Sequence, residues 1–183
     1  MMPLISPLNE LEQLLGRWAN FYLIASAAAA TLIGLLFVVI TLAAERRAAD
    51  ADGLAKIRLY LTPTVVYFAS VLGVATLLTF PNHSLLSAMF CICLVGLPGL
   101  VYTGSILIGG DKKSYEDRHD LLPYAAYPFA AYGVIVLGGV LLAWNIQRGL
   151  TVVAVGMLSM LTIGIRNSWA IAIGVLSTRS GGP

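Results

Sequence analysis

The sequence predicts an all-α membrane protein, a five-transmembrane-helix bundle with a short N-terminal amphipathic helix. Of its 183 residues, 58% are hydrophobic and 11% are charged, and the mean hydropathy is +0.86. Soluble domains carry about 25% charged residues, so this composition excludes that class. Five apolar runs occupy residues 21–44, 59–80, 85–110, 124–144 and 150–176. Each run reaches the roughly 20 residues that a helix needs to cross a bilayer.

One membrane domain, residues 21–176, accounts for most of the chain, and residues 177–183 are a short C-terminal tail. Residues 1–20 predict an amphipathic helix with Pro7 at its first helical position. Its apolar face carries Leu8, Leu11, Leu15 and Trp18. We expect this helix to lie in the outer membrane–water interface. Packing on a neighbouring subunit, or over the mouth of a pore, fits the same pattern.

The positive charges outside the apolar runs predict the orientation of the chain. Of the 11 Lys and Arg residues, only Arg17 and Arg148 lie on the side of the N-terminus. Eight lie on the opposite side: Arg46, Arg47, Lys56, Arg58, Lys112, Lys113, Arg118 and Arg179. The positive-inside rule places the richer side in the cytoplasm. We therefore expect a multi-pass protein of the cell's inner (plasma) membrane, with the N-terminus outside and the C-terminus in the cytoplasm.

Arg166 is the only charged residue within any of the five runs. It follows Leu150 by sixteen residues, which places it roughly 24 Å along its helix. A charge inside the bilayer costs about 2.5–3.5 kcal/mol on insertion scales, so it needs water, a partner or an anion. No run contains Asp or Glu, which excludes an intramembrane ion pair within one subunit. Arg166 is then either functional or the end of a shorter helix, from which it reaches lipid phosphate.

Polar side chains are expected to gather at the depth of Arg166. Ser159 and Thr162 precede it by seven and four residues, so the three share one face of a helix. Three tyrosines lie eight residues from the cytoplasmic ends of their runs: Tyr67, Tyr102 and Tyr132. That spacing puts each tyrosine roughly 12 Å deep, near the level of Arg166. We hypothesise a polar layer that coordinates an anion or solvates the arginine.

The third run carries a predicted helix break at Pro98. Proline removes the hydrogen bond to the carbonyl of Leu94, and Gly96 and Gly99 flank it. The pattern indicates a kink or a short unwound stretch. Unwound backbone is tolerated at membrane depth only where protein or a cavity surrounds it, which favours the plain kink.

Small residues recur at helical spacing in three of the runs. They are Ser26, Ala30 and Gly34 in the first, Gly133, Gly138 and Gly139 in the fourth, and Gly156, Met160, Gly164 and Ser168 in the fifth. Such stripes allow close contact between membrane helices, within or between subunits. One subunit of five helices can bury only part of this surface, so we expect a homo-oligomer.

Two functions fit these features. The first is a homo-oligomeric channel-like pathway for ions or small solutes, with an anion preference set by a ring of Arg166. The alternative is a non-conducting accessory or scaffold protein that binds a partner helix or a lipid headgroup. The expected partners are membrane lipid, further copies of the chain and an anion.

Catalysis, cofactors and nucleic acid are not expected. The two histidines, His83 and His119, lie in loops on opposite sides, and no phosphate-binding or nucleophile motif is present. The net charge of +2 is too small to indicate nucleic-acid binding. A loop cluster is only a weak metal signal: Glu116, Asp117, His119 and Asp120. We therefore expect neither an enzyme nor a metal protein.

Overall fold

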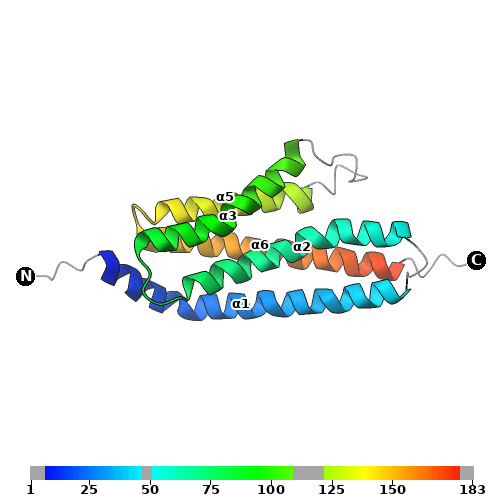
Figure 1. The fold of residues 1–183 in the computed structure, drawn as a ribbon, viewed down its shortest axis with the longest axis horizontal. Coiled ribbons are helices and arrows are strands. Elements are labelled where there is room, and N and C mark those ends of the chain that lie inside the picture. Colours follow the sequence, from blue (N-terminus) through cyan, green and yellow to red (C-terminus); the bar gives the residue numbers. More distant parts are fainter. Residues whose placement is uncertain (1–6, 47–50, 109–121, 178–183) are drawn as a thin grey trace, which may run out of the picture.

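The computed structural model describes residues 7–46, 51–108 and 122–177, which form a bundle of long helices (Figure 1). The elements are α1 (Pro7–Arg46), α2 (Ala51–Leu78), α3 (Leu85–Ile108), the short π-helix η1 (Leu122–Ala126), α5 (Tyr127–Leu141) and α6 (Ile146–Ser177). Five helical stretches are long and apolar enough to cross a membrane: Glu10–Leu42, Leu61–Leu78, Leu85–Ile108, Tyr124–Leu141 and Ile146–Ile173. The fourth stretch runs from η1 into α5. These helices confirm the prediction of an all-α five-helix membrane bundle.

The N-terminal amphipathic segment is the beginning of α1 and not a separate helix. Figure 1 shows these first turns, in dark blue, inclined to the rest of α1. Leu11 is fully buried and belongs to the main core cluster, with Leu15 and Trp18 packed against that cluster. Part of the apolar face therefore packs on the chain's own bundle. Its location at the membrane–water interface stays a prediction.

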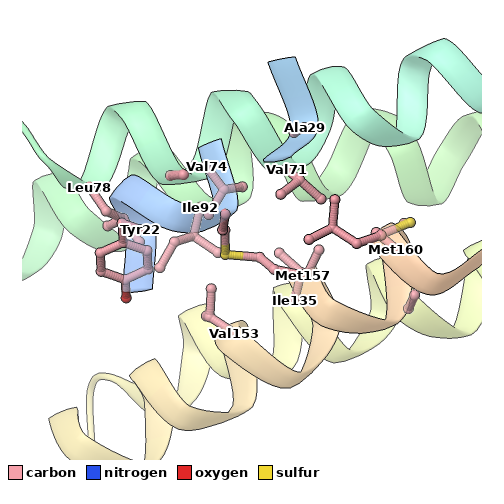
Figure 2. Close-up of a cluster of buried hydrophobic side chains, with 14 of the residues drawn as sticks. Tyr22, Ala29, Val71, Val74, Leu78, Ile92, Ile135, Val153, Met157 and Met160 are labelled. Carbon is pink, nitrogen blue, oxygen red and sulfur yellow. The ribbon is translucent and has the colours of Figure 1, made fainter. Parts of the chain in front are cut away.

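Two helices, α2 and α6, form the centre of the bundle. α6 packs against α5, α2 and α1, while α2 packs against α1, α6 and α3. Half of an apolar 18-residue window in each is buried, against 44% for the fourth span, 22% for α3 and 17% for α1. Figure 2 shows the centre filled by apolar side chains, among them Val71, Ile92, Ile135 and Met157, all fully buried. The interior of the bundle is therefore occupied by apolar side chains.

Glycines bring α5 and α6 into backbone contact. A Cβ on Gly138 would lie 2.7 Å from the backbone nitrogen of Val153, and one on Gly156 would lie 3.1 Å from that of Ile135. A backbone atom of the facing helix cannot move aside as the end of a flexible side chain can. Both positions therefore require glycine. The small-residue stripes of the fourth and fifth runs are thus packing surfaces within one subunit. Gly34 of α1 differs, because a Cβ there would meet nothing within 4 Å.

Helix α3 continues through Pro98 from Leu85 to Ile108, so the predicted break is not an unwound stretch. Figure 1 shows α3, in green, bending along its length. The ring of Pro98 is exposed, whereas Gly96 and Gly99 are buried. A Cβ on Gly96 would lie 2.8 Å from the Cγ2 of Val136, so this glycine serves close packing on α5. On this bent but continuous helix, the proline therefore lies on the exposed face and the two glycines lie on the buried face.

Candidate functional site

The bundle brings two of the three predicted tyrosines together. Tyr67 of α2 and Tyr132 of α5 are both fully buried. Their ring centroids lie 6.4 Å apart with an interplanar angle of 68°, an edge-to-face pair. Such a pair contributes about 0.5–1.5 kcal/mol beyond the burial of its area. The two tyrosines, which were predicted to lie at the same depth, are therefore in direct contact.

The hydroxyl of Tyr67 satisfies a backbone carbonyl in the fourth span. It donates a hydrogen bond of 2.6 Å to the carbonyl oxygen of Tyr124, in η1. Tyr124 lies in the π-helical turn ahead of α5, and Pro128 in the next turn has no N–H to donate. The tyrosine of α2 thus adds a donor from another helix at the point where a proline interrupts the α-helical hydrogen bonds.

The hydroxyl of Tyr132 is engaged with α2 in a similar way. Ser70 donates its single hydroxyl hydrogen to the carbonyl of Val66 at 2.8 Å, and its oxygen lies 2.7 Å from that of Tyr132. Tyr132 must then be the donor between the two hydroxyls, since a serine has only one hydrogen to donate. On α3, a Cβ on Gly99 would overlap the ring of Tyr132. Tyr132 thereby connects α5 to both α2 and α3.

Tyr102 and Arg166 lie on the outer surface of the subunit. Tyr102 is 40% exposed, and the side chain of Arg166 is exposed on α6. The four predicted residues therefore do not form a layer enclosed inside one subunit. Helix α6 continues beyond Arg166 to Ser177, so the interpretation in which the helix ends at Arg166 is wrong.

Ser159 and Thr162 line an open groove of about 520 Å³ between α5 and α6. The α5 side of this groove includes Tyr127, Ala130 and Val134. Each groove hydroxyl bonds to the carbonyl four residues earlier on α6: Ser159 to Val155 and Thr162 to Leu158, both at 2.9 Å. Internal bonding of this kind is how serine and threonine are accommodated on membrane helices. The predicted stripe thus faces outward, along one wall of the α5–α6 groove.

The sequence did not reveal three polar or aromatic residues that line the groove or are buried in the bundle. Tyr127 lines the groove and is 50% exposed, while Asn167, next to Arg166, points inward and is fully buried. Tyr22 of α1 is also buried, and its hydroxyl has no hydrogen-bond partner among the described residues. Figure 2 shows it within the apolar cluster. The polarity of Asn167 inside an apolar run was a visible signal, whereas no spacing distinguished Tyr22 or Tyr127 from membrane-interface aromatics.

The described residues form a membrane protein of five helices long and apolar enough to cross a bilayer, and Arg166 lies on the exterior of this bundle. No known protein family, curated protein or solved structure matches the chain. The acidic loop cluster Glu116, Asp117, His119 and Asp120 lies outside the described residues.

Proposed function

We propose that this chain is a non-conducting accessory or scaffold protein of the membrane. Its binding surface is the exposed α6 face that carries Ser159, Thr162 and Arg166. The observation that carries the proposal is the exposure of Arg166 on α6, the central helix of the bundle. A charge kept in a membrane span at a cost of a few kcal/mol is expected to bind something. Because Arg166 is exposed, we expect its partner to lie outside the bundle.

The buried polar groups support the same function. The hydroxyl of Tyr67 bonds to η1 and that of Tyr132 bonds to Ser70 of α2, so these groups hold α2 to the fourth span. Apolar side chains fill the space between α2, α5 and α6. Any conduction path would then have to run between subunits.

The channel-like pathway remains a second candidate because of one observation. Thr162 and Arg166 are exposed and Ser159 is half-buried on the same face of α6, so a ring of subunits could turn this stripe toward a common axis. A ring of arginines around that axis would favour anions. This candidate requires the homo-oligomer that the small-residue stripes led us to expect, and the open face of Gly34 on α1 is compatible with such contacts.

Flux through purified protein in liposomes separates the two candidates. We would compare chloride with potassium flux for the wild type, Arg166→Ala and the control Arg148→Ala, an exposed arginine at the other end of α6. The accessory function predicts no flux above empty liposomes for any of the three, with helical content and monodispersity confirming folded protein. Chloride-selective flux that Arg166→Ala abolishes and Arg148→Ala preserves would establish the channel instead.

We also propose that the protein lies in the inner membrane with its N-terminus outside. The support is the distribution of Lys and Arg, two against eight, across the two sides.

A further inference from the structure

We infer that the α5–α6 groove and Arg166 together bind one anionic phospholipid, with an acyl chain in the groove and the phosphate on the guanidinium. This inference rests on the proposed function, in which the same α6 face is a binding surface. It names the partner of that face.

The groove has the size and chemistry of an acyl-chain site. Its volume of about 520 Å³ falls within the roughly 300–1,000 Å³ of small-molecule pockets. Alanine, valine, leucine and isoleucine supply most of its lining. The hydroxyls of Ser159 and Thr162 are already bonded to α6, so they present mainly their carbon atoms to an occupant. An apolar chain therefore loses no hydrogen bond on entering.

Arg166 follows the groove residues of α6 toward the C-terminal end of that helix. It follows Ile163 and Thr162, two lining residues, by three and four positions, which makes it their neighbour on the helix surface. The Cα–Cβ bond of a helical residue tilts toward the helix N-terminus, so the side chain of Arg166 starts in the direction of the groove. One molecule can then contact both the groove and the guanidinium.

The guanidinium is available for an anion. Arg166 is exposed and makes no hydrogen bond or ion pair with any of residues 10–42, 61–108 and 124–173. It carries five N–H donors and no acceptor, in a fork that fits phosphate through two parallel bonds. The apolar run of α6 ends at Leu176, ten residues beyond Arg166, so Arg166 lies about 15 Å from that end. A phosphate drawn inward from the headgroup region can reach it.

Charge complementarity favours a lipid over a second copy of the chain. Residues 13–44, 59–110 and 124–176 contain no Asp or Glu, so the spans of another copy offer no carboxylate at this depth. A phospholipid brings a phosphate together with an acyl chain that fits the groove. The anionic headgroup of phosphatidylglycerol carries no ammonium to compete with the arginine, whereas the zwitterionic headgroup of phosphatidylcholine does.

Trp169 provides a local reporter of lipid binding. It is 69% exposed and lies three residues beyond Arg166 on α6. In a Trp18→Phe, Trp144→Phe background it is the only tryptophan, and both replaced residues lie toward the other end of the bundle. Its fluorescence would be measured in phosphatidylcholine vesicles that contain increasing brominated phosphatidylglycerol, and in matched vesicles with brominated phosphatidylcholine, because bromine quenches tryptophan at short range.

The expected result is quenching by brominated phosphatidylglycerol at about tenfold lower content than by brominated phosphatidylcholine, the scale of a charge-assisted hydrogen bond. Arg166→Gln should abolish this preference, Arg166→Lys should keep part of it, and the control Arg148→Gln should leave it unchanged. Filling the groove with Ala130→Phe should weaken quenching. Ala27→Phe, on the exposed surface of α1 and outside the groove, should not.

The outcomes separate this inference from the proposed function. Equal quenching by the two lipids in the folded wild type, or an unchanged preference in Arg166→Gln, overturns the lipid site. Reduced self-association in Arg166→Gln and Ala130→Phe, measured by energy transfer between labelled copies without any change in lipid preference, overturns it in favour of a second copy. The proposed function fails only if the liposome assay shows the Arg166-dependent chloride flux described above.

Discussion

Tyr67 and Tyr124 join α2 to the start of the fourth span through a single hydrogen bond of 2.6 Å between a phenol and a backbone carbonyl. The bond exists where Pro128 interrupts the regular donors of that span. Both residues are buried, so this hydrogen bond is shielded from water. A proline that would ordinarily weaken a helix is accommodated by a side chain from another helix.

Replacing Tyr67 with Phe should lower the free energy of unfolding by about 0.5–1.5 kcal/mol, because the buried carbonyl of Tyr124 loses the hydrogen bond from the Tyr67 hydroxyl. The measurement is unfolding in mixed detergent micelles followed by helical circular dichroism. The control is Tyr127→Phe. The Tyr127 side chain is half-exposed, so loss of its hydroxyl should change the free energy of unfolding by less than about 0.5 kcal/mol. In a Pro128→Ala background, which restores a backbone N–H, the cost of Tyr67→Phe should be smaller. An equal cost in both backgrounds would contradict this account of the bond.

The hydrogen bond between Ser70 and Tyr132 should show measurable coupling. A cycle of Ser70→Ala, Tyr132→Phe and the double mutant is expected to give a coupling energy of about 0.6 kcal/mol, and at most about 1.7 kcal/mol, as for other side-chain bonds between membrane helices. Unfolding of the four proteins under identical conditions provides the value. Strict additivity of the two single mutants would show that the 2.7 Å contact contributes nothing to stability.

Gly99→Ala and Gly34→Ala should have opposite effects. A methyl group at position 99 must displace the buried ring of Tyr132, at a cost of about 1–3 kcal/mol. At position 34 the methyl meets no atom within 4 Å, and alanine is the better helix former by about 0.5–1 kcal/mol. Both variants would be compared with the wild type by thermal unfolding. A loss of stability in Gly34→Ala would instead indicate that a second subunit contacts this face.

The orientation can be tested with two reporters. In a Cys91→Ala, Cys93→Ala background, Gln147→Cys introduces one exposed thiol at the beginning of α6. A membrane-impermeant maleimide added to intact cells should label it, because this end is expected to lie outside. A green fluorescent protein fused after Pro183 should fluoresce, since the C-terminus is expected in the cytoplasm. Labelling only after the cells are opened would reverse the assignment.

The sequence was sufficient to predict the number of spanning helices, because bilayer thickness sets the length and the apolar composition of a span. It also placed Tyr67 and Tyr132 at a common depth, since rise per residue is constant along a helix. The direction in which each side chain points depends on how helices rotate against one another, and residue counts do not contain that rotation. Tyr102 shares the predicted depth yet is 40% exposed. The side chain of Arg166 is exposed on α6 for the same reason.

The central place of α6 has a consequence for how the protein is made. Because α6 follows the other described helices in the chain, it leaves the ribosome after α1, α2, α3 and α5 have been synthesised. Until then, the faces of α5, α2 and α1 that α6 covers remain open to lipid. These faces are covered only once the α5–α6 hairpin has formed. Truncation before α6 should leave a chain that inserts in the membrane but is degraded by quality-control proteases.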